Sequence, residues 1–122
     1  MAETASRRFV LLRHTGHGPL HFDLMIEDGK TLATWQFEFS PVLLAPGTAV
    51  ACRRLAAHRT AYLDYTGPVS RNRGQVHRTD TGICNLTFFT SHWDLEFRGT
   101  ILRGPFTLKG VGGADWLLAR SA

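Results

Sequence analysis

The chain has 122 residues, of which 43% are hydrophobic and 20% are charged, a balance typical of a folded domain and not of a disordered chain. Its longest apolar runs span only a handful of residues, which excludes a membrane-spanning helix, and its first residues lack the apolar stretch of a secretory signal. The net charge is +4 and twelve of the fourteen cationic residues are arginine. This favours a polyanionic partner such as nucleic acid, although genome base composition can also enrich arginine.

We predict a disordered tail over residues 1–6 and a single domain over residues 7–122, located in the cytoplasm. The two cysteines, Cys52 and Cys84, are far apart in the sequence and show no CxxC spacing. They are therefore expected to be reduced thiols in a cytoplasmic protein, and neither has a neighbouring ligand that suggests zinc.

The first predicted elements form a hairpin. After His21, apolar and polar residues alternate strictly, which predicts a strand with one buried face. The strands Arg8–His14 and His21–Glu27 can pair over the loop 15–20, and the Asp-Gly pair at 28–29 predicts a turn into Thr31–Phe37.

The rest of the chain continues as short strands separated by turn residues. Loops are expected at Pro41–Gly47 and 67–74, a turn at 80–82, and the only candidate helix is a turn or two around Arg53–Ala57. Many short strands with frequent turn signals favour an all-β barrel or sandwich. The further strands are predicted at Thr48–Leu55, Thr60–Tyr65, Gln75–Arg78, Ile83–Thr90, Trp93–Arg98, Thr100–Leu102, Phe106–Lys109 and Trp116–Ala119.

Three side chains of the predicted hairpin could form a metal site. His14 and His21 would face each other near the loop end, and Asp23 would share a strand face with His21. Two imidazoles and a carboxylate are a ligand set that suits manganese or zinc and leaves positions open for water and substrate. The alternative is that the three residues are unconnected. His17, in the loop, is expected to be exposed and not a ligand.

A second group lies between Leu55 and Gly74. His58 and Tyr62 could act together on a phosphate, because a histidine can donate a proton and a tyrosine hydroxyl can hold an oxygen. Arg71 and Arg73, in a loop bounded by glycines, could bind phosphate, and Arg54 is a third candidate for this role. The alternatives are a core tyrosine, a histidine at the rim of the barrel and a solvated surface turn.

The two groups together resemble a known family. Both the segment from His14 to Trp35, with LHFDLMIEDG and LATW, and the segment HRTAYLDYTGPV with its following RGQV are similar to the 3′-phosphoesterase module of bacterial DNA ligase D and its short stand-alone relatives. The resemblance extends more weakly to GPFTLKG and DWLLAR. It implies a small closed β-barrel of about eight short strands with one or two short helical turns.

The resemblance also implies an activity. Family members are manganese-dependent hydrolases of DNA repair by non-homologous end joining. They remove a terminal ribonucleoside and then the 3′-phosphate from DNA ends. On this basis His14, His21 and Asp23 fall on metal-ligand positions, with Mn²⁺ expected and Zn²⁺ or another divalent metal as the alternative. His58 and Tyr62 fall on the phosphate site.

The resemblance further implies partners. They are DNA or DNA/RNA 3′ ends, beside a polymerase or ligase, and the chain is expected to be monomeric and to bind no membrane.

The sequence departs from the family at several positions. One more residue than usual separates the two histidines, so His14 or His17 could complete the ligand set. The family arginine two residues after the aspartate is Met25 here. Only thirteen residues precede His14, so we expect the longer N-terminal arm that contributes to ribonucleoside removal in the family to be absent. We therefore predict weak phosphoesterase activity, with an inactive nucleic-acid-binding barrel as the alternative. Met25 is expected to point into the groove and not into the core, and the missing charge could come from Arg53, Arg54 or Arg73.

Overall fold

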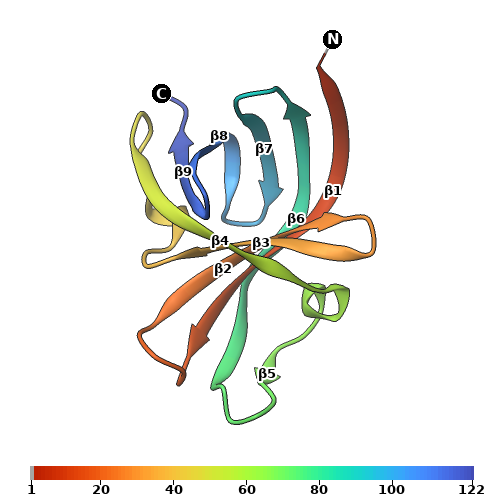
Figure 1. Ribbon diagram of the computed structural model, residues 1–122, viewed down its shortest axis with the longest axis vertical. Coiled ribbons are helices and arrows are strands. Elements are labelled where there is room, and N and C mark those ends of the chain that lie inside the picture. Colours follow the sequence, from red (N-terminus) through yellow and green to blue (C-terminus); the bar gives the residue numbers. More distant parts are fainter. Residues whose placement is uncertain (1) are drawn as a thin grey trace.

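The computed structural model describes residues 2–122, and its strands close into an antiparallel β-barrel (Figure 1). The predicted all-β class and the closed barrel are confirmed. The helical elements within residues 2–122 are two 3₁₀ turns, η1 (Pro41–Leu43) and η2 (Thr60–Leu63). The strands are β1 (Glu3–Thr15), β2 (His21–Asp28), β3 (Thr31–Phe37), β4 (Ala49–Arg59), β5 (Gly67–Pro68), β6 (Gln75–Phe88), β7 (Trp93–Gly99), β8 (Arg103–Gly112) and β9 (Asp115–Arg120).

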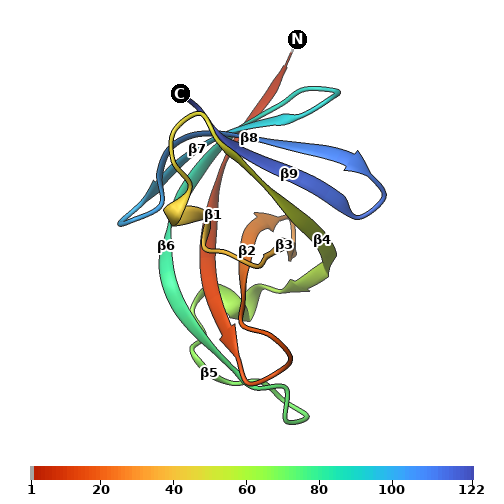
Figure 2. The same ribbon diagram turned by 90° about the vertical axis from the view of Figure 1, so that its left-hand side faces the viewer.

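Eight of these strands form the barrel in the order β1-β2-β3-β4-β9-β8-β7-β6, and β6 closes it by pairing with β1. The short β5 pairs with β6 outside the barrel. Closure leaves no long unpaired edge on the main sheet. Both termini lie at one end of the molecule, whereas the β1–β2 connection and the segment around β5 lie at the opposite end (Figures 1 and 2).

The buried apolar residues form two clusters on opposite faces of the first strands. Phe9 and Leu11 belong to the larger cluster, which includes Trp35, whereas Val10 and Leu12 belong to a smaller one. A run of four apolar residues is typical of a strand that is buried on both faces. The smaller cluster lies beneath the segment that contains η2 and β5, and it consists of Val10, Leu12, Met25, Leu32, Leu63, Val69 and Val76.

The elements differ from the prediction at three segments, 3–6, 53–57 and 60–63. Residues 3–6 are not a tail, because β1 begins at Glu3 and pairs with β6 from that residue onward; Met1 lies outside the described residues. The segment 53–57 is part of β4 and not a helical turn, and Thr60–Leu63 is the 3₁₀ turn η2 and not a strand. For residues 3–6 and 53–57, pairing with a distant strand overrides the local residue preference. For Thr60–Leu63, strand pairing has already ended at Arg59, so the local preference for a strand is not realised.

The turn predicted at 80–82 is wrong, because these residues lie inside β6, where Asp80 accepts backbone N–H bonds from a distant turn. That turn contains Thr100–Leu102, which was expected to be a strand. The hairpin β1–β2, the strand Thr31–Phe37 and the strands corresponding to β7, β8 and β9 are confirmed, with ends that differ by a few residues.

The described residues also bear on the cysteines and on membrane crossing. Cys52 and Cys84 are free and buried, and burial raises the pKa of each thiol to about 12. Both side chains therefore stay protonated at neutral pH. Within residues 2–122, neither helical turn has the length and apolar character to cross a membrane.

Candidate metal centre

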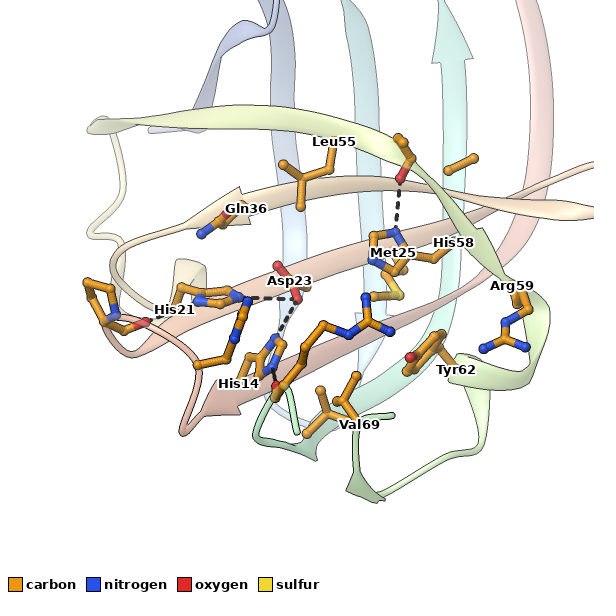
Figure 3. A pocket seen from close by; sticks show the side chains of 16 residues that line it. His14, His21, Asp23, Met25, Gln36, Leu55, His58, Arg59, Tyr62 and Val69 are labelled. Atoms are coloured by element: carbon orange, nitrogen blue, oxygen red, sulfur yellow. Dashed lines mark hydrogen bonds and ion pairs between the residues drawn. The ribbon is translucent and has the colours of Figure 1, made fainter. Parts of the chain in front are cut away.

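The β1–β2 hairpin brings His14, His21 and Asp23 together as the alternation of residues predicted. His14 is the direct cross-strand neighbour of His21, and their ring centroids are 4.6 Å apart. Oδ2 of Asp23 lies 3.7 Å from Nδ1 of His14 and 3.6 Å from Nε2 of His21. Potential ligand atoms of the three residues all lie within 4.8 Å of one another (Figure 3). The geometry therefore groups His14, and not His17, with the other two residues.

Hydrogen bonds to backbone carbonyls fix the orientation of both imidazoles. Nε2 of His14 donates to the carbonyl of Arg73 at 2.7 Å, and Nδ1 of His21 donates to the carbonyl of Pro19 at 3.1 Å. A carbonyl can only accept, so in the neutral rings the hydrogens lie on these nitrogens. The other nitrogens therefore direct their lone pairs toward Asp23. Such support by a carbonyl is common behind histidine ligands of metals.

Asp23 is the most deeply buried member of the group. It is 3% exposed, and its Oδ1 has no hydrogen-bond partner among the described residues. Burial raises the pKa of this carboxyl, and the nearby His21, His14 and His58 offset the rise only in part. A buried carboxylate that faces two lone pairs is poorly stabilised unless a cation or a proton joins it. The two nitrogens and the carboxylate oxygen thus fit a divalent metal ion.

The three residues lie in a cleft of about 620 Å³ (Figure 3). This volume is within the usual range of ligand sites, roughly 300–1,000 Å³. Among the described residues that line it, Asp23 is the only acidic one, whereas Arg59 and Arg73 are basic. The remaining lining residues are His14, His17, Pro19, His21, Met25, Gln36, Leu55, Ala56, Ala57, His58, Tyr62, Val69 and Val76. The cleft is therefore suited to an anionic ligand.

A β-bulge places His58 in this cleft. Thr34 pairs with Leu55 and Leu32 pairs with His58, so β4 contains one residue more than β3 between these positions. Leu55 and His58 are three residues apart and would point to opposite faces of a regular strand, but the bulge brings both to the same face. Nδ1 of His58 donates to the carbonyl of Ala56 at 2.9 Å, which leaves Nε2 without the hydrogen in the neutral ring.

Tyr62 reaches the cleft from η2 and not from a strand. Its ring packs edge-to-face against His58, with centroids 5.7 Å apart. The pair predicted from the spacing of His58 and Tyr62 is therefore present, but a helical turn positions it. Both residues are half-buried.

The three predicted phosphate-binding arginines differ in position. Arg73 lines the cleft, and its guanidinium donates to the carbonyl and hydroxyl of Ser70 at 2.9 and 3.0 Å. Arg71 is exposed at the tip of the turn, where it adopts a φ of 61°, and it is not among the described residues that line the cleft.

The prediction for Arg54 is wrong. Arg54 is the cross-strand partner of Trp35, so its side chain points to the same, inward face. Its guanidinium packs over the rings of Trp35, Trp93 and Trp116 at 5.1, 5.6 and 5.5 Å from their centroids. This is a cation–π arrangement away from the cleft.

The sequence prediction missed other lining residues. Arg59 and Gln36 line the cleft, and exposed His17 lies on its rim, with its ring stacked 6.1 Å from that of His14. Gln36 lies on β3, two strands away from β1, and Arg59 ends β4 just before η2. Gln36 is the direct cross-strand partner of Asp23, so the register of β2 with β3 brings it to the cleft, whereas the position of Arg59 depends on how β4 leads into η2.

Met25 is on the same face of β2 as His21 and Asp23 and lines the cleft, as predicted. The expectation that Met25 stays out of the core is wrong, because it is 1% exposed and belongs to the smaller apolar cluster, so it contributes to the packing as well as to the wall of the cleft. Its thioether offers an apolar contact and no charge.

No protein-family model and no curated protein matches this chain. The resemblance to the 3′-phosphoesterase module therefore stays a prediction from motifs.

Proposed function

We propose that this protein is a metal-dependent phosphoesterase that acts on the 3′ ends of nucleic acids. One observation supports the proposal above all others: two imidazole lone pairs converge on a buried carboxylate, and one oxygen of that carboxylate has no partner among residues 2–122. This arrangement lies in a cleft that also holds His58 and Tyr62.

The metal ligands in this proposal are Nδ1 of His14, Nε2 of His21 and a carboxylate oxygen of Asp23. This set of donors suits Mn²⁺, with Zn²⁺ as the alternative. When bound, the ion would supply Lewis-acid polarisation of a phosphoryl oxygen. The carbonyls of Arg73 and Pro19 would hold the two imidazoles in the ligating tautomers.

The other residues of the cleft have roles that their positions allow. Hydrolysis of a 3′-phosphate forms a bond between phosphorus and the oxygen of a water molecule, which gives up a proton to the solvent. It breaks the bond between phosphorus and the 3′ oxygen, which must gain a proton as it leaves. His58 can donate that proton from Nε2 when the ring is charged, because its Nδ1–H is already bonded to Ala56. The hydroxyl of Tyr62 and the guanidinium of Arg73 would hold the phosphate oxygens.

The charge of the cleft supports a nucleic-acid substrate. Its lining contains one carboxylate and two arginines among the described residues, and the chain carries a net charge of +4. Contacts to phosphates of the backbone would position a 3′ end with little dependence on base sequence. A polymerase or ligase that acts on the same ends is the partner that we propose from the sequence motifs.

A second candidate is a nucleic-acid-binding barrel that keeps the metal but does not catalyse hydrolysis. The observation that favours it is the buried, apolar Met25 beside the ligands. An arginine at such a position could form charge-assisted bonds to the transferred phosphate, each worth roughly 1.5–3 kcal/mol.

Phosphate release from a DNA duplex that ends in a 3′-phosphate, measured with and without Mn²⁺, tests the proposal. Mn²⁺ binding is measured separately by paramagnetic broadening of NMR signals. His21→Ala should abolish both. His17→Gln is the matched control, because His17 lies on the rim of the same cleft but outside the ligand group, and it should preserve both.

Metal binding without phosphate release would favour the second candidate. Phosphate release that does not depend on the metal, or broadening that His21→Ala leaves unchanged, would contradict both candidates.

A further inference from the structure

A second, smaller cavity of about 260 Å³ lies beside the metal cleft. The two cavities share Arg59 and Tyr62, so one begins where the other ends. Ala61, Tyr65, Pro68 and Ser70 complete the lining of the smaller one. Among the described residues that line it, none is acidic, one is basic and two are aromatic.

Tyr65 is exposed but firmly positioned. It is 39% exposed, and its hydroxyl donates to the carbonyl of Pro68. Gly67, with a φ of 142°, passes close beneath the ring, and a Cβ there would lie 3.1 Å from the Tyr65 hydroxyl. An aromatic ring that is held in place at the surface loses little further conformational entropy when a planar ligand stacks on it.

Three rings lead from the metal cleft to this cavity. His58 packs edge-to-face on Tyr62, with centroids 5.7 Å apart, and Tyr62 packs edge-to-face on Tyr65, with centroids 6.0 Å apart. Ligand atoms at the metal group and a ligand ring on Tyr65 would therefore occupy adjoining parts of one continuous surface.

We infer that the smaller cavity binds the nucleobase of the 3′-terminal nucleotide by stacking on Tyr65, while Arg59 contacts the adjoining backbone phosphate. This inference rests on the proposed function, since it extends the substrate from a phosphate monoester to a nucleotide that carries its base. Aromatic side chains next to a cationic residue are the usual platform for single-stranded nucleic acid, and stacking tolerates any base. Ser70 contributes only one hydroxyl, so little discrimination between bases is expected.

The test uses two short single-stranded DNA oligonucleotides that end in a 3′-phosphate and carry a 5′ fluorophore. One has a normal base on its terminal nucleotide, and the other has an abasic sugar there. Affinities are measured by fluorescence anisotropy with Mn²⁺ withheld, so that neither oligonucleotide is hydrolysed. The native protein should bind the oligonucleotide with the base about tenfold more tightly.

Three substitutions locate the effect. Tyr65→Leu should remove the preference for the base, whereas Tyr65→Phe should retain it because the ring remains. Ala61→Gln, which extends a side chain into the cavity and leaves Tyr65 intact, should also remove the preference. Phe89→Leu is the matched control: Phe89 is 42% exposed, lies outside both cavities and should have no effect.

Equal affinity of the native protein for the two oligonucleotides, a preference that persists in Tyr65→Leu, or no binding at all would overturn the inference. Phosphate release from both oligonucleotides in the presence of Mn²⁺ is measured in parallel. Equal affinities with intact release would overturn the stacking site and leave the phosphoesterase. A base preference without release would overturn the phosphoesterase and leave the stacking site.

Discussion

Two aspartates are buried in the barrel wall, and their surroundings are opposite in kind. Asp80, on β6, is 5% exposed, and each of its carboxylate oxygens accepts two backbone N–H bonds. Asp23, on β2, is 3% exposed, faces two imidazole nitrogens and has one oxygen without a partner among the described residues. The four donors to Asp80 are the amides of Thr81, Thr100, Ile101 and Leu102, at 2.7 to 3.0 Å.

The pKa values of the two carboxyls follow these surroundings. Burial alone would raise the pKa of Asp80, but the four amides outweigh burial and hold it below the usual value. Burial raises the pKa of Asp23, and its imidazole neighbours compensate only in part. Burial is therefore no guide to the role of a charged side chain. The role follows from the partners: Asp80 stabilises the fold, whereas Asp23 remains available to a cation.

Replacement of Asp80 should have the largest effect on the protein. Asp80→Asn keeps one acceptor oxygen and turns an NH₂ group toward two of the four amides, which then lose their acceptor. We expect the free energy of unfolding to fall by about 4 kcal/mol, nearly a thousandfold in the folding equilibrium. Urea denaturation measures it.

The matched control for this prediction is Asp94→Asn on β7, which should change stability by less than about 0.5 kcal/mol because Asp94 is exposed. Gly99→Ala offers an independent test, since a Cβ on Gly99 would collide with the Asp80 carboxylate. Full stability in both Asp80→Asn and Gly99→Ala would show that this network does not stabilise the fold.

These two aspartates also show how far the sequence could predict the molecule. The group around Asp23 was predictable, because alternation fixes the face of His21 and Asp23 and the hairpin fixes the position of His14. The role of Asp80 was not: Asp-Thr-Gly predicts a turn, but the donors to Asp80 lie about twenty residues further along the chain.

The cleft shows the same limit. His58 and Tyr62 were paired correctly, but the bulge in β4 and the turn η2 that bring them together depend on contacts between distant segments. Arg54 was misassigned because its inward face follows from its pairing with Trp35. Local patterns therefore predict which residues share a strand face, whereas strand pairing decides which faces meet.

Asp23→Asn should stabilise the metal-free protein, whereas Asp80→Asn should destabilise it. Asp23→Asn should also weaken metal binding strongly. Affinity for Mn²⁺ should fall by about a hundredfold or more, because a charged ligand is lost. Without metal, the variant should be more stable than the native protein by on the order of 1 kcal/mol, since the amide can donate to the lone pairs of His14 and His21. Isothermal titration and urea denaturation measure the two effects.

His17→Gln is the control for metal affinity, which should not change. A metal-free Asp23→Asn protein as destabilised as Asp80→Asn would contradict the distinction between the two aspartates, because it would assign Asp23 a structural role.

Met25→Arg tests whether a positive charge beside Asp23 increases phosphate release. The new guanidinium would lie two residues from Asp23 on the same strand face and could bind the phosphate, so release from the 3′-phosphate duplex should rise by about tenfold at saturating Mn²⁺. Because Met25 is packed in the smaller apolar cluster, the same change should lower stability by about 1–3 kcal/mol.

Met25→Leu, which conserves volume without charge, should leave the rate near the native value. An unchanged rate in a folded Met25→Arg protein would indicate that another residue, such as Arg73, already supplies the charge.

The smallest effect that we expect concerns how the free energy of unfolding depends on pH. The two aspartates should contribute to this dependence with opposite signs. The native state holds a proton on Asp23 more tightly than the unfolded state does, because burial raises its pKa. Acidification therefore stabilises the native protein at this site. The advantage of Asp23→Asn should accordingly shrink as the pH falls from 7 through the raised pKa of Asp23.

Asp80 behaves in the reverse way, since its pKa is lower in the folded state. Its contribution is complete above the ordinary carboxyl range, about pH 4, and disappears as the pH falls through the lowered value. Urea denaturation at a series of pH values, with a chelator present, measures both effects. As the pH falls, the free energy of unfolding of Asp23→Asn should decrease toward that of the native protein. The deficit of Asp80→Asn should also shrink, but only at more acidic pH. An advantage of Asp23→Asn that stays constant down to pH 4 would mean that the buried carboxylate is not the source of the difference.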